Sequence, residues 1–398
     1  MPDQTVFNRH PRLMLLLIVM LMFAGLILGV ESYARIKFRN AEIYDDFVSI
    51  LRNENFPNYE QIVKDSNAFT DKLSYYDYFL WSPKPKETNT MKITHYFSSR
   101  YVPDSFPFEK ADMIIWIFGG STMMNTDTTD ELSIANQLAK NLKGQGAKPT
   151  VVNFGVSSFH SSLETIKFQE MLRKVPRKEI PGIAIFYDGY NDSYLGFFYG
   201  AGKLPVTVSS KLEALITGKS GKLFLYNGSN LISQVSYFWK HHVSHRINAI
   251  LFRGEGQYDD SYNLDKTVDV YEMNTRMIRS ICSEFGIRPI FILQPMIFTK
   301  KHLTTFEHTV IKKVNTHLIS FMTSYYGNVQ ERMQKYADFH DMSHILNESR
   351  RNDFYDMGHT GPYTGIIIGN EIARIVLSKQ YYAGRMQTNM QNYKFSNK

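Results

Sequence analysis

Short apolar runs alternate with amphipathic stretches over the middle and the end of the chain. The apolar runs have the length of buried strands and lie at 113–118, 150–154, 183–187 and 288–293. The amphipathic stretches have the apolar spacing of helices and lie at 132–142, 162–172, 268–285 and 363–378. Strands that alternate with helices in this way predict an α/β fold, a three-layer α/β/α sandwich with a mainly parallel sheet.

The segments that follow the predicted strands carry glycines and polar side chains. The carboxyl ends of parallel strands lie at one edge of the sheet, and ligands bind there in such folds. Three segments follow strands, at 118–122, 153–155 and 189–192, and a fourth, 356–359, precedes the closing helix. We therefore expect these four segments to meet at one edge of the sheet.

An apolar run without charges occupies residues 13–30. Its length is at the low end for a membrane-spanning helix, about 17–25 residues. It has no small-residue cleavage site, so it predicts an uncleaved signal anchor rather than a removed signal peptide. Residues 1–12 would form a cytoplasmic tail and the rest of a single-pass chain would lie in the periplasm or at the cell surface. Basic residues just after the run weaken this orientation signal.

The rest of the chain divides by composition. Residues 31–110 read as a juxtamembrane lead-in, with helical periodicity at 41–51. Residues 111–380 carry the alternating strands and helices, interrupted at about 195–265 by an insertion rich in Gly, Ser, Lys and aromatic residues. Residues 381–398 form a polar tail.

Composition and charge exclude several classes of function. The chain has 398 residues with 43% hydrophobic content, enough for one large core. Its net charge of +7 is scattered and is not accompanied by a nucleic-acid motif, so we expect no nucleic-acid partner. The single cysteine, Cys282, allows no intramolecular disulfide and has the apolar neighbours of a buried helical thiol.

Ser121 is the candidate nucleophile. It follows a predicted buried strand and two glycines, Gly119 and Gly120. The glycines allow a sharp turn that exposes the hydroxyl, and the N–H groups of a following helix face a developing anion. An ordinary serine at a helix start has the same local pattern, so this segment alone does not predict catalysis.

Gly155 and Asn191 are candidate donors to an oxyanion. Each lies shortly after a predicted strand. A glycine N–H allows close approach of a substrate oxygen, and the Asn191 amide is a neutral donor suited to a negatively charged oxygen. Taken singly, each is also a common turn residue.

Asp356 and His359 supply a carboxylate and a base three positions apart. This spacing lets the imidazole face Ser121 while the carboxylate holds its other nitrogen. A second group of possible metal ligands comprises Asp338, His340, Asp341 and His344. No Cys or Glu completes a usual ligand set there, so a metal ion is not the favoured interpretation.

In this order, the four segments resemble the blocks of the SGNH hydrolases, a branch of the GDSL-type esterases. The family name refers to Ser, Gly, Asn and His, which here fall on Ser121, Gly155, Asn191 and His359. The resemblance covers about residues 111–380. The first block reads Gly-Gly-Ser-Thr instead of Gly-Asp-Ser-Leu, a variant found in membrane-anchored bacterial members.

The resemblance implies an SGNH/flavodoxin-like fold and ester chemistry without a cofactor or metal. Ser121 would attack the carbonyl, His359 would act as base and then acid, and Asp356 would orient His359. The N–H groups of Ser121 and Gly155, with the Asn191 amide, would form the oxyanion hole.

Three functions are compatible with these residues. The first is a membrane-anchored esterase that removes acyl groups, foremost acetyl, from a carbohydrate or a related small ester. The second is an O-acyltransferase that modifies a cell-surface glycan, with a membrane acyltransferase partner as acyl source. The third is a non-catalytic glycan-binding or scaffold protein, against which the complete set of residues argues. Water and a sugar hydroxyl would use the same triad, so the sequence leaves the first two open.

Overall fold

The computed structural model describes residues 56–70, 73–76, 80–201 and 260–378, with Val48, Ile50 and residues 12–26 apart from 13 and 24. The chain divides into two compact units. One consists of Met1–Asp45 with Pro205–Tyr258, and the other of Asp46–Leu204 with Asp259–Lys398. The second unit contains the sheet and all the candidate site residues. The polar tail predicted at 381–398 lies outside the described residues.

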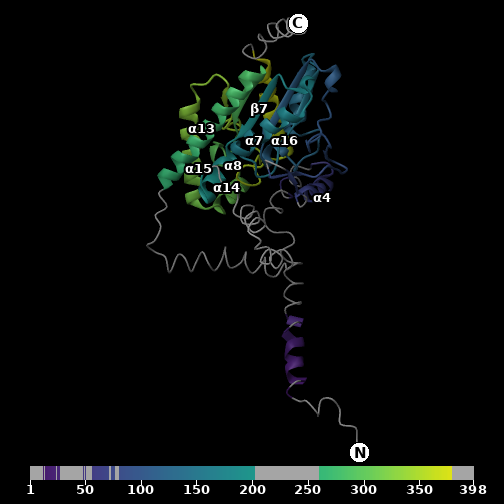
Figure 1. Cartoon of the computed structure of the whole chain (residues 1–398). Helices are drawn as coiled ribbons and strands as arrows, with labels where there is room; N and C mark the ends of the chain where they lie inside the picture. Colours follow the sequence, from purple (N-terminus) through teal and green to yellow (C-terminus); the bar gives the residue numbers. More distant parts are fainter. Residues whose placement is uncertain are drawn as a thin grey trace, which may run out of the picture. The chain divides into compact units, whose positions relative to one another are not determined.

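A parallel sheet forms the centre of the second unit (Figure 1). It has five strands, in the order β6 (Pro149–Asn153), β5 (Met113–Gly119), β7 (Ile183–Asp188), β8 (Arg288–Leu293) and β9 (Phe339–Asp341). Every neighbouring pair is parallel. The predicted α/β class and parallel sheet are thus confirmed. The sequence did not predict β9, because a strand of three polar and aromatic residues carries no periodic signal.

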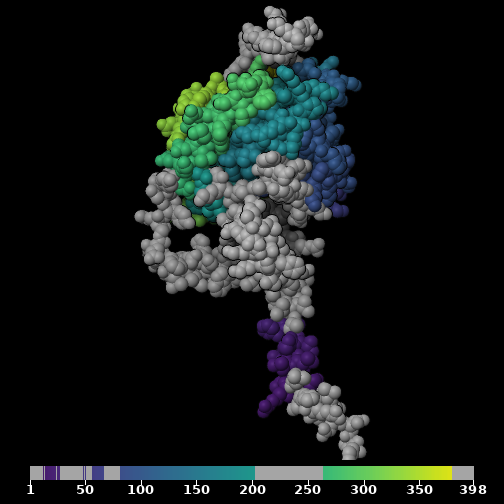
Figure 2. Space-filling model, viewed as in Figure 1, coloured from purple at the N-terminus to yellow at the C-terminus, as the bar shows by residue number. Residues whose placement is uncertain are grey.

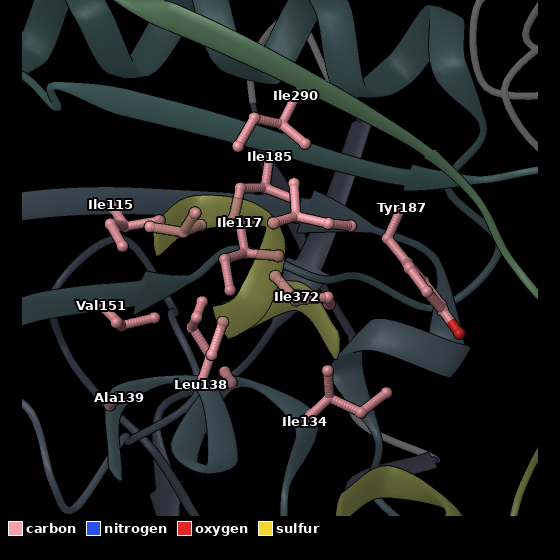
Figure 3. Close-up of a cluster of buried hydrophobic side chains, with 14 of the residues drawn as sticks. Ile115, Ile117, Ile134, Leu138, Ala139, Val151, Ile185, Tyr187, Ile290 and Ile372 are labelled. Atoms are coloured by element: carbon pink, nitrogen blue, oxygen red, sulfur yellow. The ribbon is translucent and has the colours of Figure 1, made fainter. Parts of the chain in front are cut away.

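Helices α6 (Ile134–Gly144) and α16 (Pro362–Leu377) pack against each other and against one face of the sheet. Figure 3 shows this aliphatic core, in which Leu138 and Ile372 meet side chains of the strands. Ser133 caps α6 by accepting the N–H of Asn136, and Pro362 begins α16, where its missing N–H costs no hydrogen bond.

Aromatic rings cover the other face. Phe118, Phe186 and Phe291 are direct partners on three adjacent strands, and their rings stack at centroid distances of 5.0 and 5.5 Å. All three are fully buried. Phe168, from helix α7 (Ser161–Lys174), meets the rings of Phe118 and Phe186 edge-on. Alternate strand residues thus separate into an aliphatic layer and an aromatic layer, as expected for a sheet covered on both faces.

Three long helices form the layer over this aromatic face. They are α7 (Ser161–Lys174), α13 (Asp260–Phe285) and α15 (Thr316–Met333). In Figure 2, green atoms of α13 and the residues after it adjoin teal atoms of the segment around α7. Cys282 lies buried in α13, as predicted, and burial raises the pKa of its thiol to about 12.

Shorter elements lie after the strands. Helix α5 (Ser121–Met124) follows β5, α8 (Tyr190–Tyr199) follows β7, and η4 (Ile297–Thr299) with α14 (Thr305–Lys312) follows β8. The insertion expected at 195–265 therefore begins within α8 and ends within α13. Its central part, 202–259, lies outside the described residues.

The lead-in is more structured than its composition indicates. It contains helix α4 and two small antiparallel hairpins, formed by β1 with β2 and by β3 with β4. The elements of the lead-in are α4 Tyr59–Thr70, β1 Leu73–Tyr76, β2 Leu80–Pro83, β3 Lys86–Glu87, β4 Lys92–Ile93 and the helical turn η1 Phe108–Lys110. A second helical turn, η2 (Arg177–Glu179), lies outside the lead-in, between α7 and β7. Ile62 of α4 packs with Phe56 and with Tyr355, close to the candidate base.

The apolar run predicted at 13–30 is described only in part. Residues 14–23 and 25–26 are helical, and apolar side chains such as Leu15 and Met22 are exposed. No helix within the described part of the chain is long and apolar enough to cross a membrane. Residues 27–47, with most of the helix expected at 41–51, lie outside the described residues.

Candidate active site

Ser121 is the first residue of α5, directly beyond the carboxyl end of β5. Gly120 caps this helix and has no room for a side chain. A Cβ atom at Gly120 would lie 2.1 Å from the amide nitrogen of Asn191 and 3.1 Å from the carbonyl oxygen of Phe159. The glycine therefore permits three chain segments to meet beside the Ser121 hydroxyl.

The structure brings Ser121, His359 and Asp356 into one hydrogen-bonded series. The Ser121 Oγ lies 2.7 Å from His359 Nε2, and His359 Nδ1 lies 2.7 Å from Asp356 Oδ2. The other oxygen of Asp356 accepts the backbone N–H groups of Gly358 and His359, at 2.8 and 2.7 Å. The carboxylate is thus fixed by its own turn, and it in turn fixes the imidazole.

The charges in this series shift the pKa values of both His359 and Asp356. Burial favours the neutral imidazole, but the charge and hydrogen bond of Asp356, with the charge of Asp127, outweigh it and raise the pKa of His359 to about 9. Burial also opposes the charge on Asp356, yet the contacts with His359 outweigh it and lower the pKa of Asp356. The pair is therefore arranged to stabilise an imidazolium beside a carboxylate.

Asn191 lies beside the serine, as the sequence predicts. It is in the first turn of α8, and its Nδ2 donates to the carbonyl oxygen of Phe159 at 2.6 Å. An amide nitrogen has two hydrogens, so one bond to Phe159 leaves a second donor. This nitrogen lies where a Cβ atom of Gly120 would be, which brings that donor next to Ser121.

Gly155 differs from the predicted free donor. Its N–H donates to the side-chain oxygen of Asn153 at 2.9 Å. The amide nitrogen of Asn153 donates to the carbonyl oxygen of Met123 in α5. A Cβ atom at Gly155 would lie 2.5 Å from the backbone nitrogen of Met124, so the glycine is needed for this close backbone approach. The sequence does not reveal that Asn153, two residues away, engages this N–H.

Two tyrosines that the sequence does not identify enclose the imidazole of His359. Tyr355 stacks on it with a ring-centroid distance of 5.7 Å and an interplanar angle of 20°. Tyr190 meets it edge-on, also at 5.7 Å. Both tyrosines adjoin motif residues in sequence, which is the only signal that could have pointed to them.

A buried ammonium group supports the segment that leads to His359. The Lys300 Nζ lies 2.8 Å from a carboxylate oxygen of Glu307 and 2.7 Å from Asp353 Oδ2, and all three side chains are buried. Glu307, in α14, also accepts the backbone N–H of Asp353 at 2.9 Å. These contacts fix the backbone just before Asp356.

Three buried carboxylic acids lie behind Asn191. They are Glu164 of α7, Asp188 of β7 and Asp192 of α8. Burial raises the pKa of each, and neighbouring carboxyl groups raise those of Glu164 and Asp188 further. Asp192 accepts the N–H and the O–H of Ser161 at 3.2 and 2.5 Å, which joins the starts of α7 and α8. An acidic residue in the first turn of a helix is common, so the sequence gives no sign of this cluster.

Three of the residues that the sequence suggests as possible metal ligands contact other protein groups. Asp338 forms a two-bond ion pair with Arg279, at 2.8 and 2.7 Å. Asp341 accepts the side-chain amide of Gln330, and the ring of His344 lies 3.3 Å from the carbonyl oxygen of Thr299. Within the described ranges, no group of three or more potential ligands is arranged to hold a metal ion.

No protein-family model matches the chain, and no curated protein matches it in sequence. An acetylxylan esterase from Geobacillus stearothermophilus has a similar solved structure, with a TM-score of 0.35 and 11% identity over 67% of this chain and 95% of that one. A protein of the G-D-S-L lipolytic family from Desulfitobacterium hafniense gives 0.34 and 11% over 66% and 99%. TM-scores this low support no argument, so the fold and the site rest on the contacts described above.

Replacing Lys300 should destabilise the protein strongly. Lys300→Met leaves two buried carboxylates without their cation, which typically costs about 3–5 kcal/mol. The neighbouring Lys301 is exposed, so Lys301→Met should change stability by less than about 0.5 kcal/mol. Urea unfolding of the two full-length variants measures the difference. Equal midpoints would show that the Lys300 cluster does not stabilise the fold.

Proposed function

We propose that this protein is a serine esterase of the SGNH type that cleaves O-acyl, foremost O-acetyl, esters of a carbohydrate or a related small molecule. The observation that carries the proposal is the hydrogen-bonded series of Ser121, His359 and Asp356, in which the serine and the histidine are 238 positions apart. A nucleophile, a base and an orienting carboxylate in this geometry are the requirements for acyl transfer through serine.

Acylation would begin with attack of Ser121 Oγ on the ester carbonyl carbon. The neutral imidazole of His359 accepts the hydroxyl proton at Nε2, and Asp356 stabilises the imidazolium. The carbonyl oxygen becomes an oxyanion that receives hydrogen bonds from the Ser121 N–H and the free hydrogen of the Asn191 amide. Collapse of this intermediate expels the alcohol oxygen, which takes the proton back from His359.

Deacylation repeats these steps with water. His359 accepts a proton from the water as its oxygen attacks the acyl carbon. The second tetrahedral intermediate then releases the carboxylic acid, and Ser121 regains its proton. Gly155 would join the oxyanion donors only when its N–H leaves or shares the oxygen of Asn153, so Asn191 is the principal side-chain donor in this proposal.

The preference for an acetylated carbohydrate rests on the resemblance of the four sequence blocks to the SGNH hydrolases. Anchorage of the chain by residues 13–30, with the site outside the cytoplasm, is also part of the proposal. It rests on the uninterrupted apolar run and on the helical conformation of its described part.

Loss of the nucleophile should abolish turnover. We expect Ser121→Ala to lower kcat for 4-nitrophenyl acetate by roughly 10⁴-fold or more, and Asn191→Ala by roughly 10²–10³-fold, because the oxyanion loses one donor. Ser280→Ala, on the exposed surface of α13, is the matched control and should retain full activity. Near-normal turnover by Ser121→Ala would rule out the serine mechanism.

Product analysis separates hydrolysis from transfer. The full-length protein is given a small acetyl ester with and without an oligosaccharide acceptor. For an esterase, we expect free acetate at the same rate in both reactions. Acetate release that falls as acetylated oligosaccharide appears would instead identify an O-acyltransferase, with Ser121 still required.

Anchorage is tested on the mature chain. We expect protein isolated from its native host to retain residues 1–30 and to enter the detergent phase on phase separation, because a charge-free run of this length favours the bilayer. A mature N-terminus located after Val30 would contradict this expectation.

A further inference from the structure

A second acid lies behind the candidate base. Asp127 is in the turn that follows α5, and its Oδ2 accepts a hydrogen bond from the Tyr355 hydroxyl. The ring of Tyr355 is the one that stacks on the imidazole of His359. Asp127, Tyr355 and His359 therefore form a second series, in which the tyrosine ring lies against the face of the imidazole ring. This series is separate from the hydrogen bond between His359 and Asp356.

The chain holds Asp127 in place by several contacts. Asp127 is buried, with 5% of its surface exposed, and its Oδ1 accepts the amide of Asn125 at 3.2 Å. Arg100 donates to the backbone oxygens of Met124 and Thr128, on either side of this acid, at 2.8 Å each. The carboxylate partner of Arg100 is Asp130, at 2.9 Å. Among the described residues, the donors to the Asp127 carboxylate are the neutral groups of Asn125 and Tyr355. Its charge therefore acts at short range on its surroundings.

We propose that Asp127 is a positioning residue for His359: through Tyr355 it holds the imidazole with Nε2 toward Ser121, and its negative charge stabilises the imidazolium that forms when the serine is deprotonated. The proposal concerns the site of the proposed esterase and rests on that function for its catalytic meaning. The link between Asp127 and His359 is a property of the folded chain and is measurable without a substrate.

In the described part of the chain, the groups that contact His359 or act on it through its charge come from four places. Its own turn supplies Asp356 and Tyr355, α5 supplies Ser121, α8 supplies Tyr190, and the turn after α5 supplies Asp127. Burial raises the pKa of both tyrosines, which stay neutral in the physiological range. Among the described residues, the negative charges that act on the imidazole are those of Asp356 and Asp127, and both raise its pKa.

This arrangement gives a definite pH dependence. His359 must be neutral to accept the proton of Ser121, so kcat/KM should rise with pH until the imidazole has lost its proton. With the pKa of His359 at about 9, that rise should extend into the alkaline range. Removal of the Asp127 charge lowers the affinity of the imidazole for its proton and should move the rise to lower pH.

The test compares the full-length wild-type protein with Asp127→Asn, which keeps the shape and an oxygen for the Tyr355 hydroxyl but removes the charge. We expect the pH midpoint of kcat/KM for 4-nitrophenyl acetate to fall, so that the fraction of maximal activity reached at pH 7 increases about threefold or more. Maximal activity itself should decrease, because the imidazolium is less stabilised. Glu131→Gln removes an exposed acid in the same segment and should leave the midpoint unchanged.

NMR titration of the His359 ring, assigned by its loss in His359→Gln, separates this proposal from the proposed function. A lower titration midpoint in Asp127→Asn than in the wild type supports the link even if no ester is turned over, and the missing turnover would then count against the esterase. Tyr355→Phe keeps the Asp127 charge and should keep the midpoint at or above that of the wild type. An unchanged midpoint in folded Asp127→Asn, or an activity loss equal at every pH, would overturn the proposal.

Discussion

The parallel pairing of β5 with β7 determines where the groups of the site meet. Gly119 is the direct partner of Tyr187, so both strands end at the same level of the sheet. The chain then turns into α5 after one strand and into α8 after the other, which places Ser121 and Asn191 side by side. A shift of one of these strands by one residue would turn every side chain of that strand to the opposite layer. The layered core therefore protects the geometry of the site.

Buried cations hold the two irregular segments that complete the site. Arg100 binds the turn after α5, and Lys300 binds the segment before Asp356. Isolated buried charges are costly, so each cation is surrounded by carboxylate and backbone oxygens. Helices and strands satisfy their own backbone groups, whereas these turns depend on side chains for the same purpose. These two cations thus help to fix the position of His359, although the segments beside it are neither helix nor strand.

The sequence predicts those parts of the fold that carry a strong local signal. The expected strand at 288–293 coincides with β8, and the strand at 113–118 differs from β5 by one residue, because long apolar runs have few other stable placements. Helix α8 was not predicted, since its aromatic residues and Gly196 give it no clear polar face. The short hairpins of the lead-in also lack a periodic pattern.

The site also contains residues that the sequence identifies and contacts that it does not reveal. Ser121, Asn191, Asp356 and His359 are recognisable because their segments have distinctive composition and follow or precede predicted elements. The bond between Gly155 and Asn153, and the contact of Asp127 with Tyr355, depend on side-chain directions in the folded chain. Asp127 and Tyr355 are 228 positions apart, and no local rule connects such residues.

The missing side chain at Gly120 has a consequence for how this site can change. The amide of Asn191 occupies the place where a Cβ atom would be, so positions 120 and 191 share one volume. The Gly-Asp-Ser-Leu form of the block puts an aspartate at position 120, and in this chain that residue would expel the amide from its place beside the serine. The two positions are therefore interdependent: a side chain at 120 fits only if the Asn191 amide moves out of this volume. Any side chain added at the start of α5 is thus also a change to the donor that α8 presents.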